Sequence, residues 1–531
     1  MTLTAINLTV KPKTLVDSDI VVGKDILELL ANAMYVDPLT IYREYIQNAA
    51  DSIDEARIAE LSIDDPNVAI ELDHVTRTVR IRDNGASIRN SDFVKRIAAI
   101  GGSHKRGTNL RGFRGVGRLS GLGYCQELVF RGKAQGDSRV VEVSWNGRAL
   151  REKMKDAAYA GSLIDIIREV VTYKETVAND KSERFFEVEL RKVQRLRNDL
   201  LMNERLIRSY LSQVAPVPFH PDFSFGEEVQ QFLTDRGVRP PIRIELNDNA
   251  GSIYHRARNA IEFNPKVTDT LRGVEFVEIF GDDGELEAFG WIADHSYMGA
   301  IPKKLGLGGI RLRAGNIQVG DESLLAPLYP ESRFVAWAMG DIHVSSGKII
   351  PNGRRDDFEH TVHYSRLQSE LGNKAAEVGH RIRTRSQQRQ RLRNVQVHFQ
   401  AIDDWHCLAV KAETPLLLKK ALMELSDENI QAAAKEVNKL REGTEDHQMA
   451  TDRLNQFITD LSTLGEQIDG KAQEQMGEFS EATENALLKA LKVVLSNARS
   501  AKVGKKTALD IVEAVSTKTY GAKGGTVQCA A

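Results

Sequence analysis

The feature that most constrains the fold of this chain is a predicted helix with a polar stripe, followed by two glycine-rich segments. Asp37 and Pro38 are typical of an N-cap and a first helical position, and they predict a helix that runs to about Leu61. Four polar side chains recur on it at spacings of four, three and four residues and therefore share one face: Glu44, Asn48, Asp51 and Glu55. Taken alone, this stripe is equally typical of the solvated face of an amphipathic helix.

The segments around this helix predict an α/β layered domain between Ile20 and about His220. An earlier helix is indicated by apolar residues at helical spacing, namely Ile26, Leu29, Leu30, Ala33 and Met34. Apolar and polar residues then alternate from Val68 to Leu72 and from Val79 to Ile81, which predicts a pair of strands. The second strand ends at Asp-Asn-Gly, residues 83–85, and the segment GFRGVG follows at 112–117.

The rest of the chain predicts two further regions. From about residue 240 to 371, the segments IRIEL, GIRLRAG and FVAWAMGDIHV predict strands with glycine-rich connections. From about His363 to Val515, proline almost disappears and apolar residues fall at helical spacing. We therefore expect an α+β multidomain chain with domains at 1–225, 226–371 and 372–515, and a flexible tail at 516–531.

Composition excludes several classes of protein. A chain of 531 residues exceeds what one core usually supports, so about three domains are expected. Hydrophobic residues make up 41%, charged residues 27% and the formal net charge is -2, so no global field favours nucleic acid or a membrane. No apolar run could span a bilayer, the N-terminus lacks the pattern of a signal peptide, and the three cysteines have no metal-ligand or disulfide spacing. We expect a cytoplasmic protein.

Three motifs in this order resemble the GHKL ATPases, which include gyrase-type topoisomerases, heat-shock protein 90, histidine kinases and MutL. The string IYREYIQNAADSIDEAR resembles their N-box, IRDNG their first glycine motif, and RGFRGVGRLSGLG their second. The stretch ILELLANAMYVDPLTIYREYIQNAADSIDEAR resembles the opening of heat-shock protein 90, and ERLIRSYLSQVAPVPFH resembles the end of that family's nucleotide domain. The resemblance implies a Bergerat-type α/β sandwich that binds ATP, an α/β middle (transducer) domain and a helical C-terminal region.

The resemblance also implies roles for individual residues. Glu44 matches the carboxylate that activates the attacking water, and Asn48 matches the amide that holds Mg²⁺. Asp83 matches the acceptor of the adenine amine, a contact that the carbonyl of guanine could not make, and Gly85 lets the backbone approach the base. The remaining expected ATP contacts are Asp51, Ile88, Ser103, Lys105, Gly112, Gly115, Val116 and Gly117.

Two departures from the family pattern stand out. The first glycine motif usually carries a second glycine, where this chain has Ser87, which predicts a stiffer or differently shaped loop. The downstream Gly-Thr of the family has no clear counterpart, and Phe185 or Phe186 occupies that neighbourhood. We assign no nucleotide contact there.

The second region resembles the middle domain of the heat-shock protein 90 family at GIRLRAGNIQVGD and MGDIHVSSGKIIPNGRRDDFEH. The family presents an arginine to the γ-phosphate from this region, and Arg355 is the match by position, with Arg354 as the alternative. A guanidinium there neutralises charge on the transferring phosphoryl oxygens.

The leading hypothesis is an ATP-driven, chaperone-like clamp, a homodimer held by its C-terminal helices, that hydrolyses ATP with Mg²⁺ and acts on protein clients. The alternative is a nucleic-acid clamp similar to MutL or the Microrchidia proteins. A local basic cluster favours it, although a solvated helical arm is equally typical of these residues: Arg381, Arg383, Arg385, Arg389, Arg391 and Arg393. A switch in a bacterial defence system against phage is a third hypothesis.

Overall fold

The computed structural model describes residues 37–61, 65–100, 117–156, 159, 162–178, 180, 182–247, 251–411, 414–472, 480–497, 504, 506–512 and 514. The helix expected before residue 36 and the tail at 516–531 lie outside these residues. The chain divides into two compact units, Met1–His380 and Arg381–Ala531, and each is described by itself.

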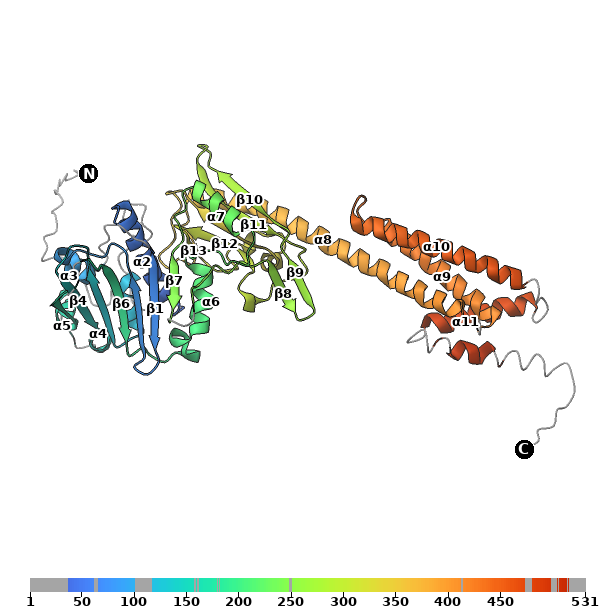
Figure 1. Ribbon diagram of the computed structural model, residues 1–531, viewed down its shortest axis with the longest axis horizontal. Helices are drawn as coiled ribbons and strands as arrows, with labels where there is room; N and C mark the ends of the chain where they lie inside the picture. Colours follow the sequence, from blue (N-terminus) through green and yellow to red (C-terminus); the bar gives the residue numbers. More distant parts are fainter. Residues whose placement is uncertain are drawn as a thin grey trace, which may run out of the picture. The chain divides into compact units, whose positions relative to one another are not determined.

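The first unit opens with a sheet of seven strands (Figure 1). Its order is β5-β4-β3-β6-β2-β1-β7, and all neighbours are antiparallel except β1 and β7. The strands are β1 (Asn67–Asp73), β2 (Thr78–Asp83), β3 (Glu127–Lys133), β4 (Arg139–Asn146), β5 (Val171–Val177), β6 (Phe185–Arg191) and β7 (Arg243–Leu246). The predicted strand pair is confirmed as β1 and β2, in register from Val68 with Asp83 to Asp73 with Thr78.

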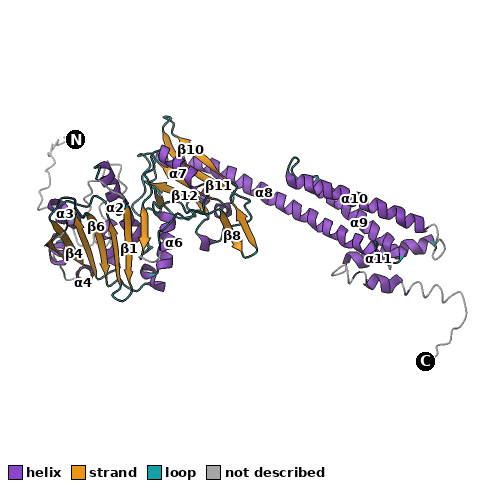
Figure 2. Ribbon diagram, in the orientation of Figure 1, coloured by secondary structure: helices purple, strands orange, loops and turns teal. Residues whose placement is uncertain are grey.

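Helices pack against one face of this sheet, so the domain has two layers (Figure 2). They are α2 (Thr40–Ile58), α3 (Asn90–Ala98), α4 (Gly147–Lys155), α5 (Leu163–Val170), α6 (Glu204–Val214) and the 3-10 helices η2 (Gly117–Gly123) and η3 (Arg197–Met202). One core joins them to the strands, with Tyr42, Phe93, Phe130 and Trp145 among its fully buried side chains. The expected α/β sandwich is thus observed.

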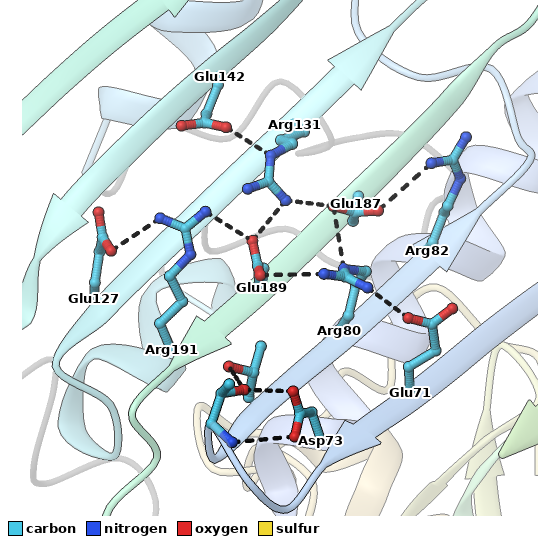
Figure 3. Close-up of polar contacts among 12 residues, drawn as sticks. Glu71, Asp73, Arg80, Arg82, Glu127, Arg131, Glu142, Glu187, Glu189 and Arg191 are labelled. Atoms are coloured by element: carbon cyan, nitrogen blue, oxygen red, sulfur yellow. Dashed lines mark hydrogen bonds and ion pairs between the residues drawn. The ribbon is translucent and has the colours of Figure 1, made fainter. Parts of the chain in front are cut away.

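The opposite face of the sheet carries a ladder of opposite charges (Figure 3). Arg131 lies within 2.7 Å of both Glu187 and Glu189, and Arg80 extends the ladder to Glu71 at 2.6 Å. The strand register causes this, because it sets an arginine beside a glutamate on neighbouring strands. The glutamates at the centre of this ladder are buried and paired with arginines, so the ladder helps to hold the strands together.

One strand departs from the expected organisation. IRIEL at 242–246 was expected in the second α/β region, but β7 pairs in parallel with β1 of the first sheet, from Asn67 with Arg243 to Ile70 with Leu246. That prediction was wrong because alternation of apolar and polar residues identifies a strand without identifying its sheet. The domain boundary at 225 and 226 stays a prediction.

The rest of the first unit is a five-stranded sheet of order β10-β11-β14-β12-β13 with a separate hairpin, β8–β9. Its strands are β8 (Ala260–Asn264), β9 (Val267–Thr270), β10 (Gly273–Phe280), β11 (Leu286–Asp294), β12 (Gly309–Ala314), β13 (Ile317–Val319) and β14 (Met339–Val344), and α7 (Gly226–Asp235) packs on them through the core around Trp291. The expected strand at 334–344 is only partly present, because its first residues belong to the 3-10 helix η6 (Ser332–Trp337).

Long helices follow, as expected. They are α8 (Val362–Ala409), which crosses from the first unit into the second, α9 (Leu416–Val437), α10 (Glu445–Ala472) and α11 (Glu481–Asn497). The second unit is helical, with two apolar cores, one around Leu422 and Leu491 and the other around Ile430 and Phe457. Among the described helices, none has the length and apolar character that crossing a membrane requires.

Candidate functional site

The polar stripe of α2 is turned toward the protein rather than toward water. Helix α2 begins at Thr40 with Leu39 as its N-cap, two residues later than Asp37 and Pro38 predicted. The side chain of Asp37 accepts a hydrogen bond from the backbone of Leu39 at 3.0 Å, and its carbonyl accepts one from Thr40, so Asp37 belongs to the turn before the helix. Glu44 is only 8% exposed and Asp51 is fully buried, while Asn48 is half-buried. The alternative of a solvated face is therefore wrong for this stripe. Buried carboxylates and amides on one helix face are typical of a binding site.

Asp83 and Gly85 lie directly under this helix. Asp83 closes β2, is buried, and accepts a hydrogen bond from the backbone N–H of Gly85 at 2.9 Å. A Cβ at Gly85 would lie 2.4 Å from the carbonyl carbon of Ser52, so only glycine fits this close approach of the turn to α2. The backbone N–H of Ala86 donates to the carbonyl of Ser52 at 2.9 Å, which locks the turn onto the helix. The first glycine motif and the N-box thus form one wall.

The carboxyl of Asp83 is chemically unusual. Burial raises its pKa to about 7, against the opposing effect of hydrogen bonds from Gly85 and Ser52, and the nearby charge of Glu55 raises it further. A carboxylate that loses so much hydration gains from a ligand that donates a hydrogen bond to it. The exocyclic amine of adenine is such a donor.

Ser87 occupies the position where the family usually has glycine. Its φ is 61°, in the left-handed region that glycine adopts without cost, so the turn retains the glycine conformation despite the substitution. The backbone N–H of Ser87 donates to Oγ of Ser52 at 3.3 Å, which helps to hold that conformation. The prediction of a differently shaped loop is not supported at this residue's backbone.

Aromatic side chains line the same region, where the sequence gave no reason to assign a nucleotide contact. Phe186 on β6 is the register partner of Asp83, and its ring lies 6.0 Å from Phe93 and 6.2 Å from Phe130. Ile88 packs partly buried against the same core. A planar base beside Asp83 would therefore meet Phe186, the residue that stands where the family's Gly-Thr is expected. Knowledge of the β2–β6 register is the signal that finds it.

The second glycine motif is described only in part. Gly117 begins η2, and Gly121 packs against α2 so closely that a Cβ would lie 2.4 Å from the hydroxyl of Tyr45. That hydroxyl accepts a hydrogen bond from the N–H of Gly121 at 3.0 Å. Five expected ATP contacts lie outside the described residues: Ser103, Lys105, Gly112, Gly115 and Val116.

The structure brings an arginine of the second region to the stripe. Nε of Arg355 lies 3.8 Å from Oε1 of Glu44, and the residue is 7% exposed. Its φ of 56° is left-handed, and its backbone is held by hydrogen bonds with Gly320 and Asn352 at 2.9 and 3.2 Å. Its neighbour Arg354, the alternative, is exposed and offers only its carbonyl to the site. The geometry thus selects Arg355 over Arg354.

Arg43 is a member of the site that the sequence reasoning missed. Its Nε lies 3.8 Å from Oε1 of Glu44, and its Nη2 donates to the carbonyl of Arg354 at 3.0 Å. Two guanidinium groups, those of Arg43 and Arg355, therefore lie near the same carboxylate oxygen of Glu44. Neighbouring residues on a helix do not normally face each other, so helical spacing gave no reason to group Arg43 with the stripe.

The arrangement can hold a nucleotide and polarise a water molecule. The amide of Asn48 is a hard oxygen ligand of the kind that Mg²⁺ accepts together with waters and phosphate oxygens, so the residue fits that ion. Within the described ranges, no three carboxylate, histidine or cysteine side chains gather as a metal cage.

Comparisons with known proteins agree with this geometry. Residues 40–172 match the family described as histidine kinase-, DNA gyrase B-, and HSP90-like ATPase. The chaperone protein HtpG of Salinispora arenicola is 33% identical over 85 residues, which are 15% of this chain and 13% of that protein. The HtpG proteins of Chromobacterium violaceum and Pasteurella multocida are 23% and 24% identical over 261 and 259 residues, 45% of this chain and 36% of each relative. The chain thus spans about a third of these relatives or less.

Proposed function

We propose that this chain, whose residues 40–172 form a domain of the histidine kinase, gyrase B and HSP90 ATPase type, hydrolyses ATP to ADP and phosphate. The observation that carries the proposal is the carboxylate of Glu44, buried on α2 and 3.8 Å from Nε of Arg355. A buried carboxylate close to an arginine from the loop after β14 joins a base to a group that stabilises phosphoryl charge.

Binding begins with the adenine base. The carboxylate of Asp83 accepts a hydrogen bond from the exocyclic amine, and Phe186 lies on the neighbouring strand at the level of the base. Because Gly85 has no side chain, the turn packs closely against α2, and any side chain there would push the turn away from the helix. Selectivity for adenine over guanine follows, since guanine presents a carbonyl where adenine has its amine.

Hydrolysis then depends on Glu44 and Arg355. Glu44 orients the attacking water and accepts its proton, while the guanidinium of Arg355 offsets the charge on the γ-phosphoryl oxygens. Bound Mg²⁺, with Asn48 as its protein ligand, would offset the charge of the β- and γ-phosphates. Nε of Arg43 lies 3.8 Å from Oε1 of the same carboxylate and helps to hold that side chain in place.

The cellular role that we propose is a chaperone-like clamp in the cytoplasm. The HtpG relatives are named as chaperone proteins, and two of them are similar to 45% of this chain. In this proposal the clients are proteins, and the chain forms a homodimer through its helical residues 372–515. The nucleic-acid alternative is less favoured, because Arg391 of the basic cluster donates a hydrogen bond to the carbonyl of Lys439 within the helical unit.

The proposal is tested with Glu44→Gln, which keeps the shape of the side chain and removes the base. ATP binding by titration should stay within about threefold of wild type, whereas turnover should fall by about 10²-fold or more. The matched control is Glu71→Gln on the charged outer face of the sheet, which should change neither quantity. Equal turnover in the two variants would remove Glu44 from the mechanism.

A second measurement separates the two classes of client. A denatured model protein and a short DNA duplex are each added to the ATPase assay at low and at high salt. Stimulation by the denatured protein alone supports the chaperone role. Salt-sensitive stimulation by DNA that is lost on charge reversal of Arg383 and Arg393 would support a nucleic-acid clamp instead.

A further inference from the structure

A buried cluster of charges lies in the second sheet, outside the nucleotide site. Asp341 on β14 is 1% exposed, and its carboxylate lies 2.9 Å from Nε2 of His255 and 3.0 Å from Nη2 of Arg256. Nε of Arg313, from the neighbouring strand β12, lies 3.5 Å from the same carboxylate. Buried ions are costly unless they are paired, so a cluster of this kind calls for a structural or functional reason.

The cluster grips the end of helix α6 of the first domain. Nη2 of Arg313 donates to the carbonyl of Gln213 at 2.6 Å, and Nη1 donates to that of Ala215 at 3.4 Å. The last carbonyls of a helix lack partners within it and carry partial negative charge, so a guanidinium suits them. The backbone N–H groups of His255 and Arg256 add bonds to the carbonyls of Pro218 and Ser212 at 2.7 and 3.0 Å.

Helix α6 belongs to the same core as the helix that carries Glu44. Ile207 and Leu211 of α6 are fully buried in the core that holds Ile41 and Tyr42 of α2. The hydroxyl of Tyr42 also donates to the carbonyl of Leu201, just before α6, at 2.6 Å. Whatever holds the second sheet to α6 therefore holds it to α2.

The other side of the cluster leads to Arg355. Strand β12, which carries Arg313, forms a hairpin with β13, and β13 ends at Val319, next to Gly320. The N–H of Gly320 donates to the carbonyl of Arg355 at 2.9 Å. The path from the end of α6 to Arg355 thus runs through one hairpin and one backbone hydrogen bond.

From this path we infer that Arg313 and Asp341 are positioning residues, which hold the second sheet on α6 and thereby place Arg355 against Glu44. The inference rests on the proposed ATPase function and adds to it the contact between the second sheet and α6 on which the placement of Arg355 depends. Neither residue touches the nucleotide. Asp341 acts by fixing Arg313 and Arg256, and Arg313 acts by fixing β12 to the carbonyls at the end of α6.

The charges in the cluster determine which substitutions test it cleanly. Burial lowers the pKa of His255 to about 4, against the opposing effect of Asp341, so its imidazole is neutral near pH 7. Asp341 then faces two guanidinium groups. Arg313→Gln leaves one carboxylate with one guanidinium and removes the bonds of Arg313 to the carbonyls of Gln213 and Ala215, while the backbone bonds of His255 and Arg256 remain. Asp341→Asn leaves two buried cations without their counter-ion and threatens folding itself.

The test compares Arg313→Gln with Arg208→Gln in the full chain. Arg208 lies on α6 itself and donates hydrogen bonds to the carbonyls of Gly251 and Ser252, in a loop outside the cluster. For Arg313→Gln we expect an ATP dissociation constant within about threefold of wild type and a kcat lowered by about 10-fold to 10²-fold, because Arg355 loses its placement. Arg208→Gln should retain both values, and Arg313→Lys, with its charge and fewer donors, should give an intermediate kcat.

Hydrogen exchange provides a readout that does not depend on turnover. Backbone amides at 316–320 and 351–358 should exchange faster in Arg313→Gln than in Arg208→Gln, while those of α2 stay protected. If both variants show the same exchange at these segments, the positioning role is refuted. If wild type hydrolyses no ATP but the exchange difference is present, the positioning role of Arg313 is supported and the proposed ATPase function is refuted. Weaker ATP binding in step with the loss of kcat would indicate general destabilisation and would also overturn the inference.

Discussion

Replacing Asp83 with asparagine should stabilise the free protein and at the same time abolish nucleotide binding. Burial raises the pKa of Asp83 from its ordinary value of 3.8 to about 7, so the folded protein binds this proton more tightly than the unfolded chain does. The stability that the protonated carboxyl contributes is complete below about pH 4. It is lost progressively as the pH rises to about 7, because the unfolded chain ionises first.

The magnitude follows from the shift. About three pH units at about 1.4 kcal/mol each make the ionised carboxylate cost roughly 4 kcal/mol of folding free energy at pH 7 and above. Asp83→Asn keeps an acceptor for the N–H of Gly85 and removes this cost. The free energy of unfolding of the variant minus that of wild type should therefore rise from about zero at pH 4 to roughly 4 kcal/mol at pH 7, and then stay constant.

Urea denaturation of both proteins between pH 4 and 8 measures this difference, followed by ATP titration at pH 7.5. Titrations elsewhere in the chain cancel, because both proteins share them. A stability difference that does not change with pH would refute the burial argument for Asp83. A variant that still binds ATP with wild-type affinity would refute its contact with adenine.

Three further predictions concern the same wall of the site. The affinity for adenosine, whose base and ribose do not titrate in this range, should fall by about tenfold per pH unit below pH 7, because only ionised Asp83 accepts the amine; a flat profile between pH 5 and 7 would contradict this. Gly85→Ala should lower the free energy of unfolding by about 1–3 kcal/mol or more, measured by heat or urea, because its Cβ meets backbone atoms of α2. The control Gly372→Ala has open space around its Cβ in helix α8 and should raise the free energy of unfolding by up to about 1 kcal/mol. Ser87→Gly should raise the free energy of unfolding by up to about 1 kcal/mol, because φ at this residue is left-handed, and a loss of stability would show that the Ser87 side chain is needed there.

The sequence predicted the wall of the site well because that wall is built from local patterns. The strand pair follows from alternation, and the turn at residues 83–85 from a glycine that no other residue could replace, whereas α2 begins two residues later than Asp37 and Pro38 predicted. Each of these signals lies within a few residues of the structure that it specifies.

What the sequence missed depends on contacts between distant segments. Arg43 joins the site only because the loop of Arg354 and Arg355 folds against α2, and Phe186 joins it through the β2–β6 register. Strand β7 was assigned to the wrong sheet for the same reason. The cluster around Asp341 gives no local signal, since its members come from separate strands and loops.

The most direct test of the central claim is incubation of the purified chain with ATP and Mg²⁺, with binding followed by titration and products by quantification of ADP and phosphate. We expect one ATP bound per chain and equal amounts of ADP and phosphate released. GTP should be a poor substitute, because guanine has a carbonyl where adenine has the amine that donates to Asp83. A chain that neither binds ATP nor releases phosphate would contradict the account and would have to be regarded as a scaffold.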